Sequence, residues 1–275
     1  MKDEQPIRSF LFVPALRLDF LDKAAASGAG AVLVDLEDAI PPARKAEARA
    51  TIGDWVSRLS GAGIKAAVRV NANDVADIQA VCAAGAWAVI VPKVNHTADL
   101  DAFRGSTQGM SSRPRLFATI ETAKGVLACA EVARVADVSG LMFGAGDFAM
   151  DTGMAFDEDV LTAPCASVVI AARAAGLPAF GLPGPITDFR NLARLTALAQ
   201  RARALGFSGT PVVHPRQVAI IEQVFGVSAD EISRAQEIVR RFEASDGLPF
   251  SDEEGLIEWP IYEAARELLR STKDR

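Results

Sequence analysis

The feature that most constrains the fold is a regular alternation: short apolar stretches are followed by longer, Ala-rich amphipathic ones from Phe10 to Phe225. The apolar stretches are continuous hydrophobic runs, which is typical of strands buried on both faces of a parallel sheet. Strands that alternate with helices are joined by right-handed crossovers. Eight such repeats in a chain of this length predict a TIM (β/α)8 barrel rather than an open doubly wound sheet.

We predict strands at residues 10–15, 31–37, 66–71, 88–94, 116–122, 140–144, 179–182 and 211–214, and helices at 19–27, 43–59, 75–84, 98–103, 124–136, 159–175, 188–205 and 217–225. The tail adds a helix at 229–244, a polar loop at 245–254 and a helix that starts near Trp259. The predicted organisation is therefore a catalytic barrel at 1–226 and a helical extension at 227–275. A helix beyond a closed barrel needs a surface to cover, so we expect the extension to pack on a neighbouring subunit.

Composition narrows the class of protein. The formal net charge is −6 and aromatic residues are scarce, so we expect neither nucleic-acid binding nor attachment to a membrane surface. The chain has no apolar run of the roughly 18 residues that a membrane span needs, and its start lacks the pattern of a signal peptide. We therefore expect a cytoplasmic protein. The three cysteines are widely spaced in Ala-rich surroundings, which predicts buried free thiols.

Polar residues follow nearly every predicted strand. In a barrel of this type the active site lies at the carboxyl ends of the strands, so these residues are expected on one rim. They are, in chain order, Arg17, the group Asp35, Glu37 and Asp38, then Arg69, Asn71, Lys93, Glu121, Asp147 and His214.

Glu121 and Asp147 follow consecutive strands, and two such carboxylates suggest a site for a hard cation. Mg²⁺ prefers oxygen ligands and usually takes one or two protein carboxylates, with water and substrate oxygens completing its shell. The alternative is that each acid caps the helix that follows it. Gly144 and Gly146 precede Asp147 and allow the backbone to approach a ligand, so we place Gly144 and Ala145 among the substrate-binding residues.

Three acids at the end of one buried strand would repel one another unless they were paired. Arg69, on the next strand, is the natural partner for Asp35, Glu37 and Asp38. This group is either a structural ion pair or part of the chemistry, because a guanidinium beside a metal stabilises a developing oxyanion. Lys93 is either a paired lysine or, less expectedly, a Schiff-base lysine.

Seven blocks carry a resemblance to a known family: RSFLFVPA, AVLVDLEDAI, VRVNA, VPKV, ATIETAKGVL, FGAGDFAMDTG and GFSGTPVVHPRQV. In this order, from about Arg8 to Phe225, they resemble the citrate lyase β-subunit-like (CoA-ester lyase) group of the HpcH/HpaI aldolase/citrate lyase superfamily. The resemblance implies a TIM barrel with Mg²⁺ on Glu121 and Asp147. It also implies that Arg69 contacts substrate, that Glu37 and Asp38 belong to the catalytic site, and that Lys93 points at the rim.

The implied reaction is a Mg²⁺-dependent cleavage of a 3-hydroxyacyl-CoA, of the citryl-, malyl- or citramalyl-CoA type, to an acyl-CoA and an oxo acid. Alternatives are a malyl-CoA-type thioesterase and a non-catalytic or partner-dependent subunit that works on an acyl-carrier thioester. Pocket shape near Met142, Met154 and the loop around Pro183 is expected to select the oxo acid.

Two segments of the chain depart from the family pattern. In the loop after the first strand Arg17 still matches that pattern, and we expect it to bind substrate. Glu258 is the nearest match to an acid that relatives place in a neighbouring subunit's site, and an acid there would transfer a proton. The resemblance therefore also implies a homo-oligomer, a homotrimer or a homohexamer.

Overall fold

The computed structural model describes residues 6–252 and 255–273, and the chain divides into two compact units. The larger unit comprises Ile7–Phe225, and the smaller one is formed mainly by the chain from Gly226 onward. Each unit is described by itself. No helix among the described residues is both long enough and apolar enough to cross a membrane.

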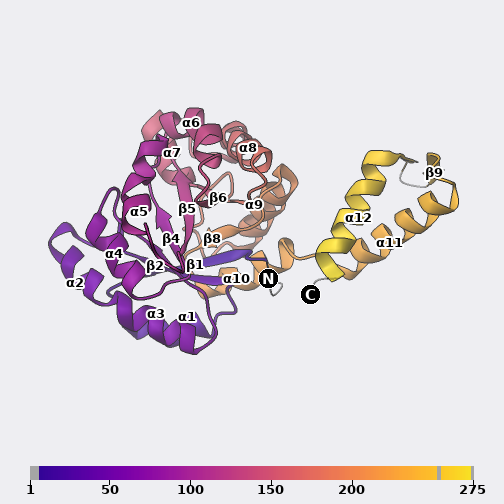
Figure 1. Cartoon of the computed structure of the whole chain (residues 1–275). Helices are drawn as coiled ribbons and strands as arrows, with labels where there is room; N and C mark the ends of the chain where they lie inside the picture. Colours follow the sequence, from indigo (N-terminus) through magenta and orange to yellow (C-terminus); the bar gives the residue numbers. More distant parts are fainter. Residues whose placement is uncertain (1–5, 253–254, 274–275) are drawn as a thin grey trace. The chain divides into compact units, whose positions relative to one another are not determined.

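The larger unit is built on one sheet of parallel strands (Figure 1). The strands are β1 (Ser9–Pro14), β2 (Ala31–Asp35), β3 (Ala66–Arg69), β4 (Ala88–Val91), β5 (Arg115–Ile120), β6 (Val138–Phe143), β7 (Ala179–Phe180) and β8 (Thr210–Val212). Their order is β7-β6-β5-β4-β3-β2-β1-β8, and a bridge between Phe180 and Gly209 joins the two ends. The Gly181 amide adds a hydrogen bond of 2.9 Å to the Gly209 carbonyl. The sheet is therefore nearly closed, and the predicted TIM barrel is confirmed.

Alternate residues of each strand face the inside of the barrel and the surrounding helices. On β1, Phe10 and Phe12 belong to the inner cluster, whereas Leu11 and Val13 pack outward. Large inner side chains fill the lower barrel, where Phe10, Phe117 and Phe180 meet edge to face with ring centroids 5.0–5.8 Å apart. Aromatic rings thus fill the lower part of the barrel.

Helices cover the outer face of the sheet (Figure 1). They are α1 (Leu21–Ala25), α2 (Lys45–Ala50), α3 (Ile52–Gly61), α4 (Val75–Ala83), α5 (Asp101–Ser106), α6 (Ala123–Ala133), α7 (Ala145–Thr152), α8 (Glu158–Ala174), α9 (Leu192–Leu205) and α10 (Pro215–Val224), with short 3-10 turns at Leu18–Phe20, Pro42–Arg44 and Thr97–Leu100. Cys129 and Cys165 are buried and Cys82 is half-buried; all three thiols are free, as predicted.

Two helix predictions were wrong. The single helix expected at 43–59 is two helices, because the Thr51 hydroxyl bonds the carbonyls of Ala48 and Ala15 and competes with the helical backbone. The short helix α7 was not predicted. Its first residues contain Gly146, and glycine is a poor helix former, so the segment resembles a loop in sequence.

The smaller unit contains α11 (Ala229–Ala244), α12 (Trp259–Lys273) and a two-stranded antiparallel sheet of β9 (Phe250–Asp252) and β10 (Gly255–Ile257). The two helices pack through a core in which the rings of Phe242 and Tyr262 stack at 4.5 Å. The expected polar loop at 245–254 was partly wrong, since β9 lies within it; residues 253 and 254 fall outside the described residues.

Candidate active site

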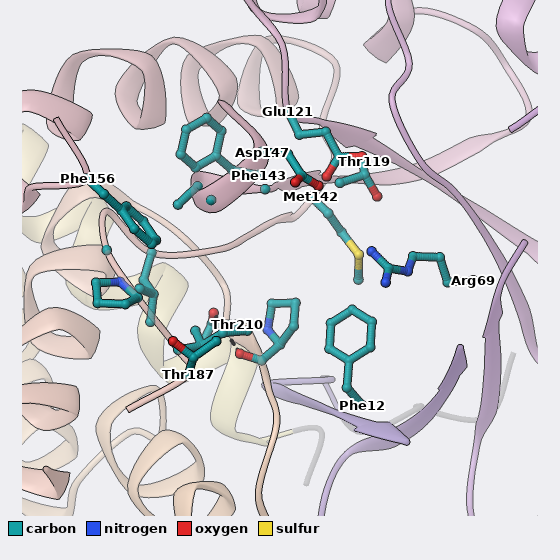
Figure 2. A pocket seen from close by; sticks show the side chains of 18 of the residues that line it. Phe12, Arg69, Thr119, Glu121, Met142, Phe143, Asp147, Phe156, Thr187 and Thr210 are labelled. Carbon is teal, nitrogen blue, oxygen red and sulfur yellow. Dashed lines mark hydrogen bonds between the residues drawn. The ribbon is translucent and has the colours of Figure 1, made fainter. Parts of the chain in front are cut away.

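A cavity of about 230 Å³ opens at the carboxyl ends of the strands, directly above the aromatic plug (Figure 2). Its lining comes from β1, β3, β4, β5, β6 and β8 and from the loops after β6 and β7: Phe12, Arg69, Ile90, Thr119, Glu121, Met142, Phe143, Gly144, Ala145, Gly146, Asp147, Phe156, Leu182, Gly184, Pro185, Ile186, Thr187, Thr210 and Pro211. Most of this surface is apolar, and its ionisable groups are Arg69, Glu121 and Asp147. The rim expected from the sequence therefore encloses a real pocket.

Glu121 and Asp147 lie together at one edge of this cavity (Figure 2). Glu121 follows β5 directly and is buried, with 2% of its surface exposed, whereas Asp147 is half-buried in the first turn of α7. The Lys93 amide donates a hydrogen bond of 2.7 Å to Glu121 Oε1. Burial, and then the negative charge of Asp147, raise the pKa of Glu121 to about 8. The two carboxylates therefore hold an unbalanced negative charge.

Neither acid is the N-cap of a helix, although Asp147 lies in the first turn of α7. Thr122 caps α6 through its own hydroxyl, and the N-cap of α7 is Gly144, which offers no side chain. Gly144 has a second role, since a Cβ at this position would collide with the Glu121 carboxyl group. A glycine directly after the β6 strand is thus the condition for placing Glu121 where it lies.

Arg69 is held by a cluster of acids on the neighbouring side of the rim, as expected. Its Nε and NH2 atoms donate to the two carboxylate oxygens of Asp35 at 2.7 and 2.8 Å, and Asp35 also accepts the amides of Glu37 and Ala39. The NH1 atom of Arg69 lies 3.0 Å from Glu37 Oε2 and 3.7 Å from Asp38 Oδ2. All three nitrogens of the Arg69 guanidinium therefore lie next to carboxylate oxygens, which hold it in one orientation.

Lys93 completes this cluster. Its Nζ lies 2.6 Å from Glu37 Oε1 and 3.4 Å from Asp38 Oδ1, so it is a paired lysine. Burial opposes its charge, but the hydrogen bond and the charge of Glu37 raise its pKa above the ordinary value. A Schiff-base lysine needs a lowered pKa, and this one is shifted the other way. Glu37, Asp38 and Lys93 are not part of the cavity lining.

Burial affects the acids of the cluster differently. Burial raises the pKa of Asp35, but the hydrogen bonds and charge of Arg69 outweigh it, so the pKa of this carboxyl lies below its usual value. Burial also raises the pKa of Glu37, and there the opposing Arg69 and Lys93 do not overcome it. Asp35 is therefore the firm anchor of Arg69.

The amino terminus of α7 lies at the cavity. Gly144, Ala145, Gly146 and Asp147 all line the pocket, and no side chain caps the helix. The first backbone N–H groups of a helix have no partner within it and favour an anion. Gly144 and Ala145, expected to bind substrate, thus lie in the pocket wall. The amide group of the helix itself was missed, because α7 was not predicted.

The sequence model of the HpcH/HpaI aldolase/citrate lyase family matches residues 8–215, which includes every acid and base described above. The chain belongs to this family.

Relatives within the HpcH/HpaI family agree with this assignment. A (3S)-malyl-CoA thioesterase of Cereibacter sphaeroides is 33% identical over 247 residues, which cover 88% of this chain and 85% of that protein. A citrate lyase subunit beta-like protein of Deinococcus radiodurans is 31% identical and covers 96% of each chain. The structure of CitE from Mycobacterium tuberculosis has a TM-score of 0.80 and 26% identity, and covers 98% of this chain and 99% of that one. That protein was solved in complex with magnesium, acetoacetate and coenzyme A.

The donor set of this family member fits a hard cation. Two carboxylates meet in a mostly apolar pocket, where burial and then the charge of Asp147 raise the pKa of Glu121. Among the described residues, no three His, Cys, Asp or Glu side chains gather to hold a metal. A pair of carboxylates suits Mg²⁺, which usually takes one or two protein carboxylates and completes its shell with water and substrate oxygens.

A second, open cavity of about 780 Å³ lies beside the first and shares Phe12 with it. Its lining includes three basic side chains, Lys23, His214 and Arg216, and also Phe20. Its lining comes from β1, from Phe20 and α1, and from the segment that leads from β8 into α10.

The structure places two further predicted residues outside the first cavity. Arg17 is exposed, pairs with Asp19 at 2.7 Å and stacks on the ring of Phe20 at 3.6 Å, beside the second cavity. Glu258 is exposed in the smaller unit, directly before α12, where its carbonyl accepts the amides of Ile261 and Tyr262. Of the three places expected to shape the pocket, Met142 and the loop Leu182–Thr187 line it and Met154 does not.

Proposed function

We propose that this chain cleaves the carbon–carbon bond of a 3-hydroxyacyl-CoA, with Mg²⁺, to an acyl-CoA and a 2-oxo acid. The observation that carries the proposal is the uncompensated pair of Glu121 and Asp147 in a cavity that also presents a fixed guanidinium. The magnesium bound to CitE supports the metal, and the coenzyme A bound there supports the class of substrate.

Glu121 and Asp147 would hold the ion. Bound Mg²⁺ would supply a Lewis acid that favours loss of the substrate's hydroxyl proton. Cleavage turns that hydroxyl into the carbonyl of the oxo acid, and the electron pair of the broken bond passes to the acyl group as a thioester enolate. The apolar walls of the pocket strengthen every charge interaction that takes part.

Arg69 is assigned to the enolate. A guanidinium that is already oriented stabilises developing negative charge without reorganising in the transition state. Asp35 holds two of its nitrogens, and Glu37 and Asp38 flank the third. In this proposal Arg69 contacts substrate, whereas Glu37, Asp38 and Lys93 position it.

The carboxylate of the oxo acid is assigned to the first amides of α7, at Ala145 and Gly146. The CoA part is assigned to the second cavity, since Phe12 lines both cavities and Lys23 and Arg216 offer positive charge to phosphates. Arg17, stacked on Phe20, adds charge at the same place.

The extension is assigned to a contact with a neighbouring subunit of a homotrimer or homohexamer. Support comes from four large apolar side chains of the smaller unit that are 40–66% exposed, namely Leu248, Leu256, Trp259 and Ile261. In that assembly Glu258 would serve as a proton-transfer group of the neighbour's site.

A thioesterase is the second candidate, and the 33% identity to a (3S)-malyl-CoA thioesterase favours it. The same cavity would then activate water for attack on the thioester, and the hydroxy acid would leave intact. The two reactions differ in which bond breaks, so their products separate them.

The test is to incubate the pure protein with Mg²⁺ and malyl-CoA or citramalyl-CoA, and to identify the products by mass spectrometry. Acetyl-CoA with an oxo acid supports the lyase. Free CoA with an intact hydroxy acid overturns it in favour of the thioesterase. No turnover, by the parent protein alone or with an acyl-carrier thioester, contradicts both and leaves a non-catalytic or partner-dependent subunit.

A further inference from the structure

We infer that the pocket takes a monocarboxylic 2-oxo acid with an apolar substituent and disfavours dicarboxylic acids such as oxaloacetate. This inference rests on the proposed function, because it assigns the part of the same cavity that lies away from Arg69. Charge, wall chemistry and the geometry of one loop carry it.

Charge is the first argument. Arg69 is the one cationic side chain among the described residues that line the cavity. Its Nε and NH2 are bonded to Asp35, its NH1 lies 3.0 Å from Glu37, and the proposed function assigns it to the enolate, so it is not free to pair with a second carboxylate. The two positive charges of a divalent cation would balance the carboxylates of Glu121 and Asp147, and none would remain for a substrate carboxylate. The α7 amides serve one substrate carboxylate, and a second one has no counterion.

The wall is the second argument. Phe156 and Arg69 lie on opposite sides of the acid pair (Figure 2). The loop after β7 contributes three apolar residues to the lining, Leu182, Pro185 and Ile186. An apolar wall favours a hydrocarbon substituent through removal of its surface from water. It penalises a carboxylate, which loses hydration without a partner.

Phe156 itself is the third argument. Its ring is 44% exposed, although it lines the cavity, and large exposed apolar side chains often mark a binding surface. Gly146 lies next to this ring, because a Cβ built on it would be in ordinary contact with the tip of the Phe156 ring at 3.9 Å. A side chain beyond Cβ at this position would compete with the ring for the space that it covers. The ring therefore forms part of the wall that the substituent meets.

Threonine hydroxyls are the competing feature. Thr119, Thr187 and Thr210 line the cavity and can donate hydrogen bonds to a carboxylate. Thr210 donates to the carbonyl of Pro211 instead, and Thr187 lies in the exposed part of its loop. A neutral hydroxyl offers a hydrogen bond without balancing a charge, so it accommodates a polar substituent less well than an ionic partner would.

The test compares two acids of nearly the same shape: oxaloacetate and 4-methyl-2-oxopentanoate, in which an isopropyl group replaces the second carboxylate. Binding to the full chain with Mg²⁺ is measured by calorimetry, and condensation with acetyl-CoA is measured in parallel. Pyruvate serves as the small apolar reference, and fresh oxaloacetate is checked for loss of carbon dioxide.

We expect both apolar acids to bind at least about tenfold more tightly than oxaloacetate, a ratio typical of pocket discrimination. Equal or tighter binding of oxaloacetate overturns the inference. Binding is scored without turnover, so absent condensation would count against the proposed function while the binding order still decides the inference.

A pair of variants tests the wall. Phe156→Arg places a cation at the cavity and is expected to move the binding ratio toward oxaloacetate by about tenfold. Met154→Arg is the matched control, since Met154 is on the same segment, 46% exposed and outside the lining. An unchanged ratio in Phe156→Arg, or an equal change in both variants, contradicts the assignment. Both positions are exposed, so folding is expected to persist and is checked by thermal unfolding.

Discussion

The carboxylates of Asp35, Glu37 and Asp38 are paired with two cations of this chain, Arg69 and Lys93. Those of Glu121 and Asp147, on the same rim, have no ion pair among the described residues. In the first group the acids fix a guanidinium and lie outside the cavity lining. In the second the acids line the cavity, and burial, followed by the charge of Asp147, raises the pKa of Glu121 to about 8.

We therefore regard the first group as a scaffold that holds Arg69, and the second as the candidate metal site. In the first group each carboxylate has a cationic partner, and these ion pairs hold Arg69 in place. A carboxylate pair that is unbalanced gains most from a bound cation, because binding removes the repulsion and the cost of burial together. Four predictions follow from this difference.

The largest effect is expected at the unbalanced pair. Asp147→Ala removes a proposed metal ligand and should lower Mg²⁺-dependent turnover by at least about a thousandfold, the loss of several kcal/mol of charge stabilisation. Product assays under saturating substrate measure it, with Asp54→Ala, an exposed acid of α3, as the control. Folding should be retained, since Asp147 makes no ion pair among the described residues. Parent-like activity would sink the site assignment.

The next effect is expected at the anchor of the balanced cluster. Asp35→Ala leaves Arg69 buried beside fewer acids and should lower the free energy of unfolding by about 3 kcal/mol. Urea denaturation measures it. The control is Asp22→Ala, whose partner Arg58 is on the surface and whose own side chain is 88% exposed; a loss below about 1 kcal/mol is expected there. Equal losses in the two variants would show that the cluster is not a scaffold.

The third prediction concerns pH. Glu121 must lose its proton when the pair binds a cation, so Mg²⁺ affinity should rise about tenfold per pH unit and level off above about pH 8. Calorimetric titration between about pH 6 and pH 9 measures it, and the number of protons released should fall over the same range.

The free energy of unfolding of the metal-free protein should change with pH in the opposite direction, and fall as the pH rises. The pKa of Glu121 is about 8 in the folded protein, against an ordinary value of 4.5, so the neutral carboxyl contributes stability that is complete below about pH 4.5. That contribution is lost as the pH rises through about 8, and Glu121→Gln should remove the dependence. A metal affinity that is flat with pH would indicate that the pair is already balanced.

The smallest effect is expected at Asp38. Its carboxylate is 53% exposed and lies 3.4 Å from Lys93 and 3.7 Å from Arg69, so solvent screens both contacts. Asp38→Asn should change kcat/KM less than about threefold and unfolding by less than about 1 kcal/mol. Steady-state kinetics over a range of pH checks this. A loss of about a hundredfold would make Asp38 a catalytic residue and erase the distinction between the two groups.

The two groups also differ in how far the sequence reveals them. Spacing at the ends of predicted strands places Asp35, Arg69 and Glu121 on one rim, because parallel strands end at one edge. The same reasoning puts Asp147 at the end of a strand, whereas it lies in the first turn of α7, a helix that Gly146 conceals. The apolar wall after β7 is in a loop, where no periodicity indicates which side chains turn inward.

Lys93 belongs to both groups at once. Its amide bonds Glu121, its ammonium bonds Glu37, and its φ of 53° is a left-handed conformation that most side chains avoid. Glycine would adopt this backbone more easily but has no side chain to reach the cluster. A protein engineer who moves this site to another barrel must therefore transplant the strained turn together with the two groups, since a single residue sets the spacing between them.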